Sequence, residues 1–210
     1  MPGTVLLVLE IIGTVSFALS GAMTALQKRM DLFGVVILGL TTAVGGGVIR
    51  DLVLGQTPPA TFQNPLYALV AVGTSLVVFF SFVRHLLERK QHIYEITLLL
   101  MDSLGLAVFT VVGIQTAYRL ADNHNAFLLL FVGVITGIGG GILRDVMAGN
   151  TPYIFVKHFY ASASLIGAAV CIILWPLLGE TVSMLLGAVL IVALRLCAAR
   201  FHWSLPKPKP

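Results

Sequence analysis

The sequence predicts an all-α integral membrane protein with seven transmembrane helices, arranged as two inverted three-helix repeats plus a seventh helix. Three observations support this prediction: the composition, the spacing of the apolar segments and a motif that occurs twice. Of the 210 residues, 58% are hydrophobic and only 10% are charged, whereas a soluble domain carries about a quarter charged residues. The mean hydropathy is +0.97. Nearly the whole chain is therefore expected to lie in the membrane, which leaves no mass for a separate catalytic domain.

Seven apolar segments are long enough to cross a bilayer, which takes about 20 residues of helix. They cover roughly residues 5–26, 34–54, 65–83, 96–118, 126–148, 159–178 and 182–200. Residues 1–205 are thus expected to form a single transmembrane domain, followed over residues 201–210 by a short basic cytoplasmic tail. Most loop cations fall on one side of the predicted membrane, and outside the repeated motif the other side has only Arg119. Because basic loops face the cytoplasm, we expect the N-terminus outside and the C-terminus inside.

A glycine motif occurs twice, each time near the end of a long apolar segment. The two copies are Gly45, Gly46 and Gly47 followed by Arg50 and Asp51, and Gly139, Gly140 and Gly141 followed by Arg144 and Asp145. Each glycine costs roughly 1 kcal/mol of helix propensity relative to alanine, and charges in an apolar segment are more costly still. Two such arrangements in one chain indicate a functional centre.

The motif belongs to a longer internal repeat, in which Glu10 aligns with Asp102 and Phe17 with Phe109. The two repeats cover residues 5–90 and 96–179, and the seventh helix, residues 182–200, lies outside them. A unit with an odd number of spans must enter the membrane from the opposite side when it is copied in tandem. The halves are therefore expected to be related by a pseudo-two-fold axis in the membrane plane.

The triple glycines have two possible roles. They either allow a kink or a tight crossing, or they break the helix and turn freed backbone groups toward a water-filled path, where a cavity satisfies them. Paired interruptions of this kind indicate a transport site. A further stripe of small and aromatic residues occurs in both halves and is expected to serve helix packing. It comprises Gly13, Phe17, Gly21 and Ala25 and their partners Gly105, Phe109, Gly113 and Ala117.

The charged residues of the two halves fall at matching depths in the predicted helical hairpins. We therefore expect two symmetry-related clusters, Glu10 with Arg50 and Asp51 on the outer side, and Asp102 with Arg144 and Asp145 on the inner side. Charges within a membrane usually face the bundle interior and pair with one another. The alternatives are a purely structural ion pair and side chains that extend to the interface.

Smaller signals concern the ends of the helices and possible ligands. The stretches that begin at Gly55 and Gly149, Gly-Gln-Thr-Pro and Gly-Asn-Thr-Pro, are predicted to end the second and fifth helices. No metal site is expected, because the five histidines lie in loops or near segment ends without the spacing of metal ligands. Lys157 with His158, and the basic tail, are expected to contact anionic membrane lipid. No nucleic-acid partner is expected, since the net charge of +4 is explained by topology.

The doubled GGG-x-x-RD motif, the G-[QN]-T-P stretch after each copy and the three-plus-three-plus-one plan resemble one family. The chain looks like a prokaryotic member of the trimeric intracellular cation channel (TRIC) family, whose bacterial sequences also carry the label of a glycine-transporter domain. The resemblance covers about residues 5–200. It implies a homotrimer in the plasma (inner) membrane with one pore in each protomer, lined by helices two and five, which are kinked at the glycines. It also implies permeation of K⁺ without tight selectivity over Na⁺.

Two functions compete at this point, and an enzyme is not expected because no Ser/His, Cys/His or metal constellation lies within the spans. In a cation channel, the four acids would attract cations while Arg50 and Arg144 tune or gate passage. In a secondary transporter of a small zwitterion such as glycine, an arginine and an acid at one site would hold a carboxylate and an amine. Inverted repeats are at least as typical of transporters as of channels, so the resemblance alone favours the channel.

Overall fold

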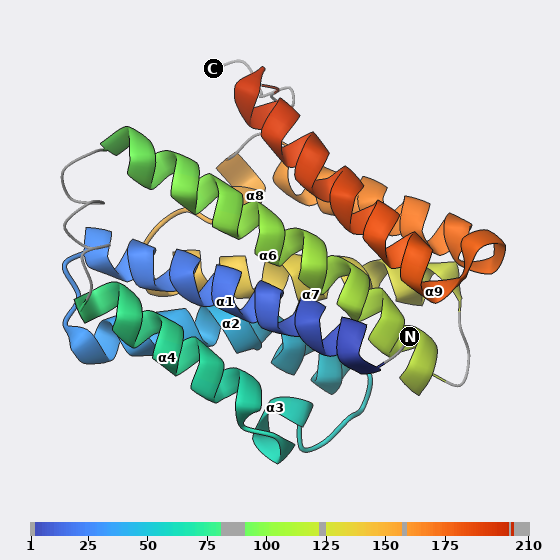
Figure 1. Cartoon of the computed structure of the whole chain (residues 1–210), viewed down its shortest axis with the longest axis horizontal. Coiled ribbons are helices and arrows are strands. Elements are labelled where there is room, and N and C mark those ends of the chain that lie inside the picture. Colours follow the sequence, from blue (N-terminus) through green and yellow to red (C-terminus); the bar gives the residue numbers. More distant parts are fainter. Residues whose placement is uncertain (1–2, 81–90, 122–124, 157–158, 202, 204–210) are drawn as a thin grey trace.

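All the regular structure within the described residues is helical. The computed structural model describes residues 3–80, 91–121, 125–156, 159–201 and 203. Its helices are α1 (Gly3–Gln27), α2 (Leu32–Val53), α3 (Ala60–Gln63), α4 (Leu66–Phe80), α6 (Gln91–Leu120), α7 (Ala126–Met147), α8 (Tyr153–Val156) and α9 (Tyr160–Arg200) (Figure 1). Five of them, α1, α2, α6, α7 and α9, are long and apolar enough to cross a membrane. The prediction of an all-helical, multi-pass membrane protein is confirmed.

The ends of the two motif helices follow local sequence signals. Asp31 and Asn125 cap the N-termini of α2 and α7, and each side chain accepts a hydrogen bond from the backbone amide three residues later, at 2.8 and 2.7 Å. Just past the C-termini, Gly55 and Gly149 have φ angles of 72° and 67°, a left-handed conformation that glycine adopts without strain. Both helices therefore end at the predicted stop signals. The four-residue helices α3 and α8 that follow were not predicted.

The last helix, α9, consists of two rods. Its 41 residues would extend about 60 Å as one straight helix, twice the thickness of a bilayer core. Gly179, with φ 75° and ψ 171°, breaks the helix, and the chain reverses there (Figure 1). The two rods pack closely, because a Cβ atom on Gly167 would lie 3.0 Å from the carbonyl oxygen of Gly187. The break falls between the predicted segments 159–178 and 182–200.

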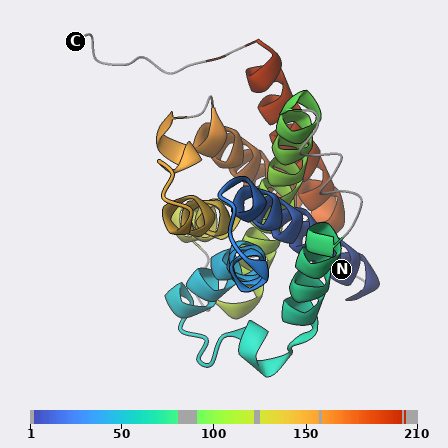
Figure 2. The same ribbon diagram turned by 90° about the vertical axis from the view of Figure 1, so that its left-hand side faces the viewer.

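The helices form two groups that meet along the middle of the bundle. In the first group, helices α1, α2 and α4 contact one another. In the second group, α6 contacts both α7 and α9. The two groups meet where α1 packs against α6 and α2 packs against α7. Seen from one end, α1 lies toward the middle of the bundle, whereas α4 and the last part of α9 lie toward its edge (Figure 2). The largest core cluster, which includes Phe17, Leu106, Ile138 and Tyr160, occupies the junction.

Some predictions concern residues outside the described ranges. These are the end of the first predicted repeat, residues 81–90, the proposed lipid contact at Lys157 and His158, and most of the basic tail from residue 204 onward.

Candidate functional site

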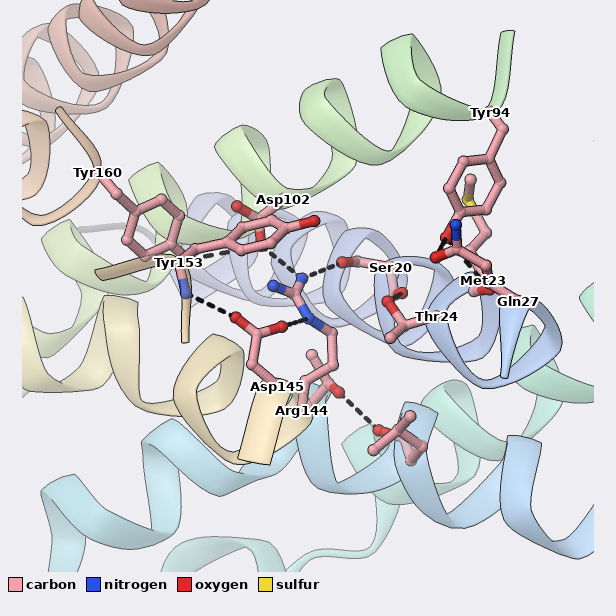
Figure 3. A network of polar contacts seen from close by, with 12 residues as sticks. Ser20, Met23, Thr24, Gln27, Tyr94, Asp102, Arg144, Asp145, Tyr153 and Tyr160 are labelled. Carbon is pink, nitrogen blue, oxygen red and sulfur yellow. Dashed lines mark hydrogen bonds and ion pairs between the residues drawn. The ribbon is translucent and has the colours of Figure 1, made fainter. Parts of the chain in front are cut away.

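Arg144 lies at the centre of a fully buried charge cluster, and its own exposure is 0%. Its Nη1 donates to Asp102 Oδ1 at 2.6 Å, and its Nε donates to Asp145 Oδ1 at 2.9 Å (Figure 3). The same Nη1 also donates to the hydroxyl of Ser20 on α1. The structure thus brings together the three residues of the predicted inner cluster, contributed by α6 and α7.

The sequence analysis missed part of this inner cluster. Arg195 Nη2 lies 3.8 Å from Asp102 Oδ2, and its guanidinium carbon lies 4.7 Å from the ring centre of Tyr160. The guanidinium carbon of Arg144 likewise lies 4.8 Å from the ring centre of Tyr153. Two arginines therefore balance Asp102 and Asp145. Because Arg195 belongs to the last rod of α9, outside the repeat, aligning the halves does not reveal it, and the only signal was a charge within an apolar segment.

The outer cluster is looser than predicted. Arg50 Nε donates to Asp51 Oδ1 at 2.8 Å, while Glu10 accepts a short hydrogen bond from the hydroxyl of Tyr67 on α4. Glu10, Arg50 and Tyr67 line one cavity of about 70 Å³, which we call the outer cavity. The side chain of Arg50 is 11% exposed, against 1% for Arg144. Two of the three predicted residues, Glu10 and Arg50, therefore share a cavity, whereas Asp51 is buried and does not line it. Glu10 has Tyr67 as its hydrogen-bond partner.

The second acid of each motif ties a long helix to the short helix that follows it. Asp51 Oδ2 accepts from the backbone amide of Ala60, the first residue of α3, at 2.8 Å. Asp145 Oδ2 accepts from the amide of Tyr153, the first residue of α8, at 2.9 Å. The two halves thus repeat the same contact, and both aspartates have a structural role in addition to pairing with the neighbouring arginine.

The glycines of the two motifs do not break their helices. Residues 45–47 and 139–141 remain α-helical within α2 and α7, contrary to the possibility of interrupted helices with freed backbone groups. Intact hydrogen bonding avoids the cost of unpaired peptide groups among apolar side chains. A Cβ atom on Gly46 would lie 2.2 Å from the Thr136 carbonyl oxygen, and one on Gly140 would lie 2.1 Å from that of Thr42. The middle glycines therefore permit a close crossing of α2 and α7.

A second, larger cavity of about 530 Å³ opens at the other end of α1, and we call it the inner cavity. Its polar lining comprises Gln27, Gln91, Tyr94, Glu95, Tyr153 and Arg195. The hydroxyl of Tyr94 lies 3.1 Å from Gln27 Oε1 (Figure 3). Glu10 and Gln27, which line the two cavities, are separated by about 25 Å of helix at 1.5 Å per residue. The Arg144 cluster lies next to the inner cavity, since Tyr153 and Arg195 belong to both.

The chain is similar to bacterial membrane proteins over nearly its whole length. A family model described as glycine transporter matches residues 7–82 and 99–176. The UPF0126 inner membrane protein YadS of Escherichia coli (strain K12) is 39% identical over 203 residues, which cover 94% of this chain and 93% of that protein. The UPF0126 membrane protein YvgT of Bacillus subtilis (strain 168) is 33% identical over 198 residues, 94% of each chain.

Two solved structures with the same fold come from work on TRIC cation channels. A TRIC trimeric intracellular cation channel orthologue from Rhodobacter sphaeroides matches with a TM-score of 0.86 and 34% identity, over 95% of this chain and 99% of that chain. A structure from work on conductance through TRIC cation channels matches with a TM-score of 0.84 and 36% identity, over 97% of each chain. The chain therefore belongs to the family described as glycine transporter, which includes the prokaryotic TRIC cation channels.

Proposed function

We propose that this protein is a monovalent-cation channel, permeable to K⁺ and Na⁺, with a pore inside each protomer. The observation that supports this most directly is the position of the charged residues. Glu10 and Arg50 line the outer cavity, and Arg144 and Asp102 lie beside the inner cavity, at opposite ends of α1. Related structures, 34–36% identical over nearly the whole chain, are described as cation channels.

The charges suggest how cations enter and where they stop. Glu10 and Asp51 give the outer cluster one more acid than base, since Arg50 is its only arginine. A carboxylate at the mouth of a pore concentrates cations there. The inner cluster is neutral, with Asp102 and Asp145 balanced by Arg144 and Arg195. We infer that Arg144 must leave Asp102 before ions pass, which makes this buried pair part of the gate.

The proposal includes the arrangement of the whole chain. Seven spans form two inverted repeats, residues 5–90 and 96–179, and the helix over 182–200 completes a single domain. The matching contacts of Asp51 with α3 and of Asp145 with α8, and the two segments matched by the family model, support this plan. The Rhodobacter sphaeroides orthologue is described as a trimeric channel, which supports a homotrimer. The Escherichia coli relative supports the bacterial inner membrane, where the protein contacts lipid.

Purified protein in planar bilayers under a KCl gradient tests the channel function. We expect unitary currents whose reversal potential lies on the cation side. Glu10→Gln removes the acid of the outer cavity and should shift the reversal potential toward zero, because K⁺ is no longer concentrated there over Cl⁻. Glu180→Gln is the matched control: Glu180 pairs with Arg119 at 3.3 Å and is not among the residues that line the outer cavity.

The competing function is secondary transport of a small zwitterion such as glycine, which an arginine beside an acid would bind by its carboxylate and amine. The same preparation decides between the two. Absence of unitary currents together with saturable uptake of glycine into liposomes would overturn the channel proposal. Currents that carry K⁺ without glycine uptake would support it.

A further inference from the structure

We propose that Phe17 and Phe109 form an apolar constriction that separates the outer cavity from the inner charge cluster. The idea rests on the channel function proposed above and deepens it, because it assigns the residues that an ion must pass between the two cavities. In the sequence these phenylalanines belong to a repeated stripe that explains helix packing. The structure adds the position of the rings, between the outer cavity and the residues that contact Arg144.

The two rings lie between the two charge clusters on the helices that carry the acids. Phe17 follows Glu10 by seven residues on α1, and Phe109 follows Asp102 by seven residues on α6. Seven residues advance an α-helix by almost two full turns, so each ring lies on the same face as its acid, about 20° away. Three residues beyond Phe17, on the inner side, Ser20 accepts a hydrogen bond from Arg144.

The rings touch each other, and one of them lines the outer cavity. Their centroids are 5.3 Å apart with an angle of 44° between the planes. Phe109 lines the outer cavity together with Glu10 and Arg50. Phe17 is 1% exposed and belongs to the core cluster that also contains Tyr160, a neighbour of Arg195. Phe109 therefore borders the outer cavity, and the buried ring of Phe17 packs against it.

Glycines on the opposite helix hold the rings in place. A Cβ atom on Gly105 of α6 would lie 2.0 Å from the ring of Phe17, and one on Gly13 of α1 would lie 3.1 Å from the ring of Phe109. Phe17 also contacts α7, since a Cβ on Gly140 would lie 3.2 Å from its ring. Each ring thus fills a notch in the neighbouring helix at the level where α2 and α7 cross.

An apolar ring pair of this kind blocks ions without any charge. A hydrated cation that reaches Phe109 finds no group to replace its water, and narrow apolar segments exclude water itself. The barrier between the cavities then has two layers, the rings and, behind them, the Arg144 ion pairs. A small rotation of either ring, or separation of α1 from α6, would open the first layer.

Planar-bilayer recordings of ring variants test the proposal. Phe109→Ala should raise the open probability or the unitary conductance by roughly fivefold or more, since a shortened apolar barrier wets more easily. Phe109→Leu keeps an apolar side chain and should stay near wild type. Phe127→Ala is a further control, because Phe127 is 77% exposed on α7. Phe17→Ala should act like Phe109→Ala if it assembles. Currents from assembled Phe109→Ala that equal those of wild type would overturn the constriction.

Cysteine labelling gives a second readout that does not depend on currents. Both native cysteines are first replaced, by Cys171→Ala and Cys197→Ala. Thr61→Cys then reports access of the reagent to the outer cavity, which Thr61 lines. Ser20→Cys reports access to the buried side of the rings. A membrane-impermeant thiol reagent applied from the outer-cavity side should label Thr61→Cys whether or not Phe109 is replaced. It should label Ser20→Cys roughly tenfold faster when Phe109→Ala is present.

The two experiments separate failure of the constriction from failure of the channel. Rapid labelling of Ser20→Cys with both rings intact would overturn the constriction even if currents flow. Labelling that depends on Phe109, in a protein that carries no current, would support the constriction and overturn the channel function.

Discussion

At the scale of single residues, the same Arg-Asp pair occupies two different environments. Arg144 is buried among two carboxylates, with side-chain exposures of about 1% throughout, whereas Arg50 has one direct ion-pair partner and borders a cavity. Removing one partner of a buried pair leaves an uncompensated charge in a low dielectric, which costs about 3–5 kcal/mol. Removing the partner of a partly hydrated charge lowers the stability of the protein by less, because water still solvates that charge. The two arginines should therefore differ in their effect on stability.

We predict that Arg144→Gln lowers stability by about 3–5 kcal/mol, because Asp102 and Asp145 are left buried without that guanidinium. Arg50→Gln should cost clearly less. Thermal unfolding of the detergent-solubilised proteins, followed by intrinsic fluorescence, measures both. Adding Asp102→Asn to Arg144→Gln makes the buried cluster neutral again, with Arg195 against Asp145, and should restore part of the lost stability, which a double-mutant cycle quantifies. Equal destabilisation by the two arginine variants would contradict the assignment.

The sequence predicts the four acids and two of the three arginines of the site, but not the partners that α4 and α9 contribute. Asp102, Arg144 and Asp145 were grouped correctly because the repeat places them at one depth. Tyr67, Tyr160 and Arg195 were missed, since α4 and α9 approach the site only through the tertiary fold. Glu10 was expected to pair with Arg50. Instead, it accepts a hydrogen bond from Tyr67, which a third helix, α4, contributes.

At the scale of helices, the glycine motifs set how closely α2 and α7 approach. Without a hydrophobic driving force between helices in lipid, close backbone contact supplies much of the packing energy. The middle glycines lie against the carbonyl oxygens of Thr136 and Thr42. The sequence indicated that the glycines are special but left two roles open. Composition alone does not say whether a glycine faces water or another backbone.

Gly46→Ala is therefore expected to destabilise the protein by about 1–3 kcal/mol, because the added methyl group overpacks against a backbone atom that cannot rotate away. Gly73→Ala on α4 is the matched control, since a Cβ there meets nothing within 4 Å. That control should be neutral or gain up to about 1 kcal/mol from helix propensity. Unfolding midpoints and the fraction of protein assembled in detergent report the effect. A neutral Gly46→Ala would mean that the two helices separate easily at their crossing.

At the scale of the whole molecule, the fold was predictable because the bilayer limits the choices. A span needs about 20 apolar residues, and the observed helices begin and end within a few residues of most predicted bounds. Composition marked the apolar segments, and the turn residues Gly55 and Gly149 marked the ends of the second and fifth helices. The short helices α3 and α8 were not predictable, since four residues carry no periodic signal and are fixed by the aspartates that bind their first amides.

The inverted arrangement leads to a prediction about two equivalent threonines. Thr57 and Thr151 occupy the same place in the repeated stretches after α2 and α7, and both are exposed. If the halves are inverted, the two side chains face opposite sides of the membrane even though their local sequences match. With Cys171 and Cys197 replaced by alanine, an impermeant thiol reagent added to intact cells should label Thr57→Cys. Thr151→Cys should react only after the membrane is opened, because the positive-inside rule places that loop in the cytoplasm. Labelling of both positions from the same side would exclude an inverted repeat, and labelling in the reverse order would keep the repeat but invert the topology.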